Sequence, residues 1–305
     1  MRPRVYASLP LRGPQGRLGR ELLRGAELAL ERAGPRAELV VLDSFDGRAT
    51  ANAEQAAADE AALAYLGDAA SADVLRSAPV LGAAALLAVA PAATFVGLSG
   101  PTLVRLLPHD GVGADAIAAW LAEQGVRDLL VVHDHDAGYG VPVGALCTEA
   151  ARERGVATRS RPVWDDAPDD LSGAQAVLYV GVAGSGASGL WRDLHALDPE
   201  LWLLGSDGIA VDWLARELDP AAGRRTRFFV PQRAPWGFYG FEAMSLILDA
   251  IEQADDRDGV VAVARGTRDR DSVLGRYSID ADGHTTTTAY GRLAVVEGEL
   301  VWDRG

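Results

Sequence analysis

The sequence has almost no cysteine and no long apolar segment. Cys147 is the single cysteine among 305 residues, so the chain can form neither an internal disulfide nor a cysteine-based metal site. No apolar run reaches the roughly 18 residues that a membrane-spanning helix requires. The longest, from Ala83 to Ala93, is rich in alanine and contains Pro91. Because 49% of the residues are hydrophobic, we instead expect folded domains that are held together by hydrophobic cores.

Positive charge is also scarce. The chain has 29 basic and 43 acidic residues, which gives a formal net charge of −14 and a pI of about 4.8. A nucleic-acid partner would require a basic surface, so the charge argues against one. No signal peptide is visible, because Met1–Arg4 leads directly into the apolar residues from Val5. We expect either a cytoplasmic protein or an exported one whose leader is absent from this sequence.

Recognised catalytic motifs are missing as well. The sequence has no G-x-S-x-G elbow, no P-loop lysine motif and no H-E-x-x-H, so no nucleophile, base and oxyanion hole can be assembled from it. One segment, Gly184–Gly189, does read G-x-G-x-x-G between a predicted strand and a predicted helix, with Asp207 about 20 residues further on. It keeps a nucleotide-dependent enzyme open as an alternative, although small residues in such a loop can equally line another cleft.

A second alternative is a metal site at His133, Asp134, His135 and Asp136. Residues at positions i and i+2 share one face of a strand, so two imidazoles or two carboxylates would point the same way. A structural zinc site, however, needs a closed set of four ligands. Solvated loop residues are the simpler interpretation, and we predict neither a metal nor a cofactor.

What the chain does contain is a regular alternation of strand-like and helix-like segments. The predicted strands are Val5–Leu9, Glu38–Leu42, Leu63–Gly67, Leu86–Ala90, Asp128–His133, Ala157–Trp164, Ala176–Val182, Leu201–Gly205 and Thr226–Val230. Alternation with helices predicts an α/β fold with parallel sheets that are covered on both faces. The alternation restarts after Pro108, and a long predicted helix from Trp236 follows the second series. We therefore expect two lobes, the first formed by residues 1–106 and 235–276 and the second by 107–234 and 277–305.

The segment after strand Leu86–Ala90 is a candidate binding loop. Pro91 ends the strand because proline cannot donate to a sheet, and Ala92, Ala93 and Thr94 follow it. Small residues let a ligand approach the backbone, Thr94 adds a hydroxyl, and ligands of parallel sheets bind beyond the carboxyl ends of the strands. An ordinary strand-to-loop junction is the plainer alternative.

Several short motifs occur in one order over nearly the whole chain. They are Val5–Pro14, Gly25–Leu30, Ala64–Gly67, Ala90–Thr94, His133–Asp134, Gly138–Gly140, Leu204–Gly208, Gly240–Leu246 and Arg270–Gly275. In this order they resemble the type I periplasmic binding proteins, in particular the branched-chain amino acid receptors of ABC transporters. The resemblance implies two doubly wound parallel-sheet lobes, joined by three crossings, that close on a ligand. We expect these crossings near Leu106, Ala234 and Tyr277.

The resemblance also implies a function. The protein would be a non-enzymatic, monomeric receptor, periplasmic or anchored at the cell surface as a lipoprotein, that captures an amino acid or a similar small zwitterion. It would deliver this ligand to an ABC permease in the membrane. A ligand-sensing domain of the same fold is an alternative within the family, and the nucleotide-dependent enzyme remains an alternative outside it.

The family pattern assigns residues to the ligand. From lobe one, Ser71 and Thr94, with the backbone at Ala92 and Ala93, would hold the ligand's carboxylate and ammonium groups. From lobe two, Tyr139 and Asp207 would meet the ligand, with Asp207 opposing the ammonium. Without the resemblance, Ser71 can be read as a helix cap, Asp207 as a cap or turn residue and Tyr139 as a packing residue.

Two further positions depart from the family pattern. Leu18 replaces an aromatic residue that the family commonly has in the first glycine-rich loop, and Ala183 or Gly184 replaces an aromatic residue after strand Ala176–Val182. We include Leu18 and Ala183 among the predicted ligand-binding residues.

Overall fold

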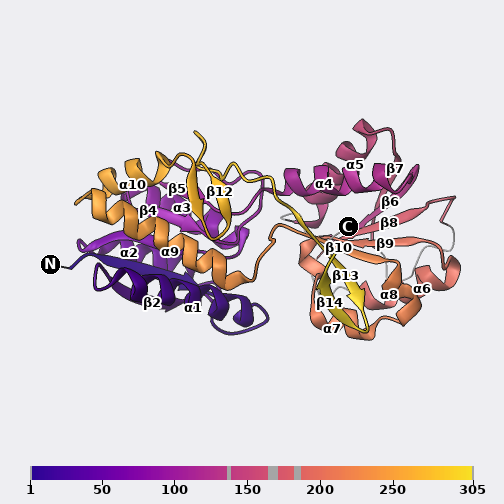
Figure 1. The fold of residues 1–305 in the computed structure, drawn as a ribbon, viewed down its shortest axis with the longest axis horizontal. Coiled ribbons are helices and arrows are strands. Elements are labelled where there is room, and N and C mark those ends of the chain that lie inside the picture. Colours follow the sequence, from indigo (N-terminus) through magenta and orange to yellow (C-terminus); the bar gives the residue numbers. More distant parts are fainter. Residues whose placement is uncertain (1, 136–138, 164–170, 182–186, 304–305) are drawn as a thin grey trace. The chain divides into compact units, whose positions relative to one another are not determined.

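The computed structural model describes residues 2–135, 139–163, 171–181 and 187–303 (Figure 1). It divides into two compact units: Met1–Pro108 with Gln232–Thr288, and His109–Pro231 with Ala289–Gly305. Each unit is built on its own mainly parallel sheet, which confirms the predicted α/β fold. Among the described residues, no helix is both long enough and apolar enough to span a bilayer.

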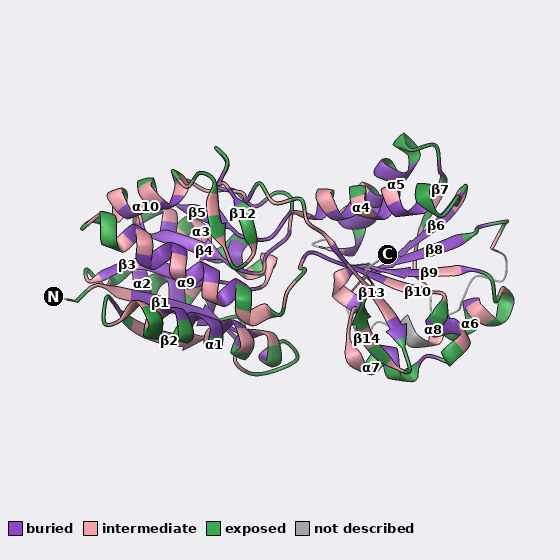
Figure 2. Ribbon diagram, viewed as in Figure 1, coloured by how far each residue is buried: buried purple, intermediate pink, exposed green. Residues whose placement is uncertain are grey.

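The first unit contains a parallel sheet with the order β2-β1-β3-β4-β5. Its strands are β1 (Arg4–Leu9), β2 (Glu38–Asp43), β3 (Ala62–Gly67), β4 (Leu87–Ala90) and β5 (Leu103–Arg105). Its helices are α1 (Gly16–Ala33), α2 (Ala49–Ala58), α3 (Ser71–Ala83), α9 (Trp236–Gln253) and α10 (Arg257–Arg265). Successive side chains of a strand point to opposite faces of the sheet. Leu87 and Val89 of β4 pack with α1, α9 and α10 on one face, whereas Ala88 packs with α2 and α3 on the other. Both faces of the sheet are therefore covered, and β1, β3, β4 and β5 are largely buried, whereas the edge strand β2 has no buried residue (Figure 2).

The second unit contains a sheet with the order β14-β13-β10-β9-β8-β6-β7. The strands are β6 (Asp128–His133), β7 (Ala157–Pro162), β8 (Ala176–Val180), β9 (Trp202–Gly205), β10 (Thr226–Val230), β13 (Gly291–Val296) and β14 (Glu299–Trp302). The helices are α4 (Asp110–Glu123), α5 (Gly140–Glu153), α6 (Ala187–Leu197), α7 (Asp212–Glu217) and α8 (Pro220–Arg224), with a 3-10 turn at Asp207–Ile209. Helices α4 and α5 share one core, and α6, α7 and α8 share the other. The strands β13 and β14 run antiparallel at one edge.

The last crossing between the units differs from the sequence-based boundary near Tyr277, because it lies after Thr288. The hairpin of β11 (Arg270–Ser272) and β12 (Gly275–Tyr277) is followed by more chain that belongs to the first unit. Ile279 is buried in the first core, and Arg105 both donates its N–H to Gly283 O at 2.8 Å and accepts from the Thr285 N–H at 3.0 Å. These hydrogen bonds pair residues 283–285 with the end of β5, a contact between distant segments that the local sequence does not predict.

Helices α1 and α9 cross so closely that glycine is required at the contact. A Cβ atom added to Gly25 would lie 1.8 Å from the carbonyl oxygen of Gly237, and one added to Gly240 would lie 1.9 Å from that of Leu22. Both obstacles are backbone atoms, which cannot move aside as a flexible side chain could. The separation of these two helices therefore depends on the absence of side chains at Gly25 and Gly240.

We predict that Gly25→Ala lowers the free energy of unfolding by about 2 kcal/mol or more, since overpacking a tight core typically costs about 1–3 kcal/mol. Gly82→Ala is the matched control in the same unit, because a Cβ there meets its nearest atom at an ordinary 3.5 Å. In this control the higher helix propensity of alanine should make the change small or slightly stabilising. Urea denaturation followed by circular dichroism measures both, and equal stabilities of the two variants would contradict the close crossing.

A fully buried carboxylate, that of Asp68, lies directly after β3. The Ser8 hydroxyl donates to it at 2.7 Å, and the Tyr65 hydroxyl lies at 3.3 Å from both of its oxygens. Asn52 in turn donates to the Ser8 hydroxyl at 3.0 Å. Burial raises the pKa of Asp68 to about 6, and the hydroxyl donors only partly oppose this effect. Asp68 thus keeps its proton more tightly in the folded protein than in the unfolded chain.

The raised pKa predicts that Asp68 favours folding most at low pH. Between the unfolded pKa near 3.8 and the folded pKa near 6, the folded state binds more protons, so this contribution falls as the pH rises. The stability difference between the parent and Asp68→Asn should decrease by about 2 kcal/mol from pH 4 to pH 7, because one pKa unit corresponds to about 1.4 kcal/mol. Denaturant titrations of both proteins across this range test it. A difference that does not change with pH would show that Asp68 has an ordinary pKa.

Candidate functional site

The predicted binding residues of the first unit follow neighbouring parallel strands. The strands β1, β3 and β4 are adjacent and parallel, so the segments that follow their carboxyl ends lie at one edge of the sheet. Leu18 lies near the start of α1 after β1, Ser71 starts α3 after β3, and Ala92–Thr94 follow β4. This edge therefore carries the whole first-unit set of predicted residues.

Ser71 and Thr94 are in direct contact. The Ser71 hydroxyl oxygen accepts hydrogen bonds from the backbone N–H groups of Thr94 and Phe95, both at 3.1 Å. Since a hydroxyl has two lone pairs and one hydrogen, these two bonds occupy its lone pairs and leave its O–H to donate. Ala70, not Ser71, occupies the cap position of α3, and it makes no side-chain cap bond. The helix-cap alternative for Ser71 is therefore wrong.

The other first-unit residues differ in how far they are buried. Thr94 and Ala93 are buried, and Ala92 is half-buried. Leu18 is also half-buried and packs against the same core as α9. Packing against this core accounts for the partial burial of the Leu18 side chain. The roles of Leu18 and of the backbone at Ala92 and Ala93 in ligand binding stay predictions.

Two of the predicted residues of the second unit, Tyr139 and Asp207, are also in contact. The strands β6, β8 and β9 are parallel neighbours, so Tyr139, which follows β6, and Asp207, which follows β9, start from the same edge of the sheet. The Tyr139 hydroxyl donates to the Asp207 carboxylate and accepts from the Gly208 N–H at 3.3 Å. Both side chains are half-buried. Ser206, not Asp207, occupies the cap position of the short 3-10 turn, but Asp207 is the first residue of that turn, so it is a turn residue as well as a partner of Tyr139.

Burial governs the electrostatics of this pair. It raises the pKa of Asp207 above its ordinary value, while the hydrogen bonds from Tyr139 and from the Gly208 N–H act in the opposite direction. Burial and the nearby negative charge of Asp207 raise the pKa of Tyr139 as well. Tyr139 is therefore a hydroxyl donor at neutral pH, and the carboxylate beside it can accept from a further donor or oppose a positive charge.

Two buried acids near this pair were not among the predicted ligand-binding residues: Asp110 was not singled out at all, and Asp134 was considered only as a metal ligand and as part of a family motif. Asp110, in the first turn of α4, is close enough to raise the pKa values of Tyr139 and Cys147. Asp134 lies against two glycines: a Cβ on Gly140 would be 1.9 Å from its Oδ1, and one on Gly181 would be 2.8 Å from its Oδ2. Two features of the sequence could have indicated a buried role for Asp134: its position at the end of a strand, and the glycines Gly140 and Gly181 that leave space for its carboxylate.

Of the two alternative sites, the structure describes part of the metal site and only the end of the glycine-rich loop. His133 Nδ1 lies 2.8 Å from the carbonyl of Asp134, and His135 Nε2 lies 3.1 Å from that of Val163, so both imidazoles have backbone partners. Within the described ranges, no group of three or more His, Cys, Asp or Glu side chains is arranged to hold a metal ion. Asp136, Ala183 and residues 184–186 of the glycine-rich loop lie outside the described residues. The roles proposed for Ala183 and for that loop stay predictions.

Comparison with known proteins identifies the family. A family model for periplasmic binding proteins matches residues 7–173, which is more than half of the chain. Comparison with curated protein sequences gives no match.

Similar solved structures include a leucine-binding protein from Thermotoga maritima, with 21% identity and a TM-score of 0.83 over 99% of this chain and 97% of the other. A substrate-binding protein of an ABC transporter from Desulfitobacterium hafniense, in complex with Leu, has 18% identity and a TM-score of 0.83 over 99% of both chains. A solute-binding protein from R. palustris, in complex with benzoate, has 16% identity and a TM-score of 0.74 over 98% and 94%. At such identities the likeness shows the fold, and the family match shows the relationship. The chain therefore belongs to the periplasmic binding protein family, with the type I fold of the solute-binding proteins of ABC transporters.

Proposed function

We propose that this protein is an extracytoplasmic receptor that binds an amino acid or a similar small zwitterion and delivers it, as a monomer, to an ABC permease. The observation that carries the proposal is the half-buried carboxylate of Asp207, held by the Tyr139 hydroxyl at the carboxyl edge of its sheet. A carboxylate in that position suits a ligand with a positively charged amine. The family match supports the receptor role, and the Leu complex of a structural relative supports the ligand class.

The first unit offers groups for the ligand's carboxylate. A zwitterion that leaves water needs a partner for each charge, because an unpaired charge in a dry site is costly. The Ser71 hydroxyl, with its lone pairs already engaged by Thr94 and Phe95, can donate its hydrogen to a carboxylate. We assign the carboxylate of the ligand to Ser71 and Thr94, with the backbone of Ala92 and Ala93 beside them.

The second unit offers the partner for the ammonium group. Charge-assisted hydrogen bonds are roughly twice as strong as neutral ones, so an anion serves an ammonium better than a hydroxyl or a carbonyl does. Asp207 supplies that anion, and Tyr139 fixes it by donating a hydrogen bond. We assign the amine of the ligand to Asp207 and Tyr139.

A carboxylic acid without an amine is the second candidate ligand, because one structural relative was solved with benzoate. Such a ligand shares the carboxylate that Ser71 would bind but has no group for Asp207. Asp207 would then repel or ignore it. The two candidates therefore make opposite predictions for the charge at position 207.

We predict that Asp207→Asn weakens the binding of leucine by about 2–5 kcal/mol, the usual cost of leaving one member of a buried charge pair alone. Ser71→Ala should weaken leucine and benzoate alike, because it removes the donor to a carboxylate. The control is Asp193→Asn, which neutralises an exposed acid on α6. Isothermal titration calorimetry of each variant with leucine and benzoate measures these changes.

The outcomes separate the candidates. If Asp207→Asn binds leucine as tightly as the parent, Asp207 does not oppose an ammonium. If the variant instead gains affinity for benzoate while leucine binds to neither protein, the ligand is an acid without an amine and the amino acid assignment fails. Binding of NAD in the same calorimeter would favour the nucleotide-dependent alternative over a receptor.

The raised pKa of Asp207 predicts a pH dependence of amino acid binding. Only the ionised carboxylate opposes an ammonium, so affinity should be full above the pKa of Asp207 in the free protein and fall about tenfold for each pH unit below it. Since burial raises this pKa, the fall should begin at a higher pH than the ordinary value of about 3.9 would give. Leucine titrations between pH 4 and pH 7 test this, with Asp207→Asn as the reference that should lack the dependence. An identical pH profile in both proteins would assign the titration to another group.

A further inference from the structure

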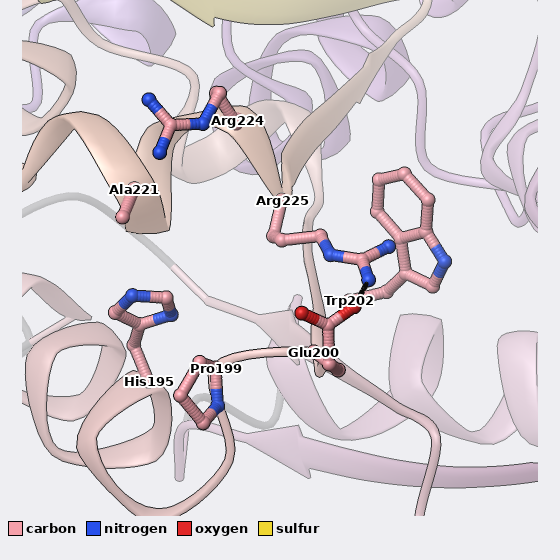
Figure 3. A pocket seen from close by; sticks show the side chains of 7 residues that line it. All are labelled: His195, Pro199, Glu200, Trp202, Ala221, Arg224 and Arg225. Atoms are coloured by element: carbon pink, nitrogen blue, oxygen red, sulfur yellow. Dashed lines mark hydrogen bonds and ion pairs between the residues drawn. The ribbon is translucent and has the colours of Figure 1, made fainter.

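A cavity of about 520 Å³ lies in the second unit, at the amino ends of β9 and β10 (Figure 3). Trp202 is the first residue of β9, and Arg225 immediately precedes β10. The other lining residues are His195 of α6, Pro199, Glu200, and Ala221 and Arg224 of α8. Tyr139 and Asp207 follow the carboxyl ends of β6 and β9, so this cavity lies at the opposite edge of the sheet from them.

The cavity gathers positive charge in a strongly acidic protein. The chain has no lysine, so all 29 of its basic residues are arginine, and Arg224, Arg225 and Arg227 fall within four positions. Arg225 forms an ion pair with Glu200, and its guanidinium lies 4.8 Å from the centre of the Trp202 ring. Within the described part of the chain, no hydrogen bond or ion pair of the Arg224 guanidinium is found. Of the two arginines that line the cavity, Arg224 is therefore the exposed one without a partner among the described residues.

A second feature of the cavity is an unsatisfied imidazole. The Nδ1 atom of His195 is buried and has no hydrogen-bond partner among the described residues. Figure 3 shows this ring beside Pro199 and Ala221, on the wall away from Trp202. A buried polar atom without a partner is unfavourable, so its presence at a cavity wall indicates a place where a ligand atom can complete the hydrogen bond.

The Glu200–Arg225 ion pair indicates which chemistry the cavity accepts. Glu200 is 81% exposed, and its carboxylate already lies on the guanidinium at the cavity wall. Exposed ion pairs of this kind contribute little stability, so a ligand carboxylate or phosphate can replace Glu200 at modest cost. Guanidinium groups match the geometry of both anions, because their N–H donors form a planar fork.

We propose that this cavity binds a small organic anion that carries carboxylate or phosphate groups, at a site separate from the amino acid site. Arg224 and Arg225 hold the anionic groups, and His195 Nδ1 donates a hydrogen bond to one of their oxygens. The volume lies within the range of metabolite sites, about 300–1,000 Å³, which favours a small molecule over a single inorganic ion. This proposal does not depend on the assignment of Ser71 and Asp207.

Imidazole NMR of the full chain tests the proposal directly. The chain has five histidines, so its ring signals are few, and the signal that disappears in His195→Gln identifies His195. Citrate should shift that signal in a saturable way in the parent protein. Inorganic phosphate, titrated in the same way, should bind more weakly if the site takes a multi-group organic anion.

Variants of the cavity residues test whether citrate binds at this site. Arg224→Gln should weaken citrate at least tenfold, whereas Arg192→Gln, an exposed arginine on α6 that does not line the cavity, should leave citrate affinity unchanged. Leucine affinity should be the same in all of these variants, which separates this test from that of the amino acid site. A His195 signal that citrate does not shift, equal citrate affinity in Arg224→Gln and Arg192→Gln, or binding of acidic peptides without binding of citrate would each overturn the proposal.

Discussion

Removing a carboxylate from water is the constraint on which much of this structure depends. In each unit an acid lies beyond the end of a parallel strand, where it loses solvent and needs donors from the surrounding chain. Asp68 obtains them from the hydroxyls of Ser8 and Tyr65, and Asp207 obtains one from Tyr139. Because these donors are uncharged, burial raises the pKa values of both acids. The two acids differ in exposure: Asp68 is fully buried, whereas Asp207 is half-buried.

The same edges of the sheets are shaped by close approaches that only small residues permit. Gly140 and Gly181 leave space for the carboxylate of Asp134, and Gly208 lies so close to Gly181 that a Cβ would be 2.2 Å from its carbonyl oxygen. In the first unit, the loop after β4, which contains Ala92 and Ala93, is joined to Ser71 by the hydrogen bond from the Thr94 N–H. The proposed recognition of a small polar ligand would therefore use backbone groups and short side chains.

The second unit presents different chemistry at the two ends of its sheet. Acidic and hydroxyl groups gather where β6 and β9 end, whereas arginine, histidine and tryptophan gather where β9 and β10 begin. Trp202 connects these arginines to the core. Its ring packs edge-on against that of Trp120, with 5.0 Å between the ring centres, and the guanidinium groups of Arg225 and Arg227 lie over it. The two ends of this sheet therefore differ in charge, and each is the place of one of the two ligand sites that we propose.

The sequence by itself determined the fold class, the family resemblance and the candidate residues, because strand periodicity, turn residues and motif order are local properties of the chain. It predicted that Ser71, Thr94, Tyr139 and Asp207 follow strands, and parallel strands bring such positions to common edges. Only the tertiary structure decided that Tyr139 contacts Asp207, that residues 277–288 stay with the first unit, and that His195 and Arg224 share a cavity. These outcomes depend on packing between segments far apart in the chain, and burial, which sets the pKa values, arises only from that packing.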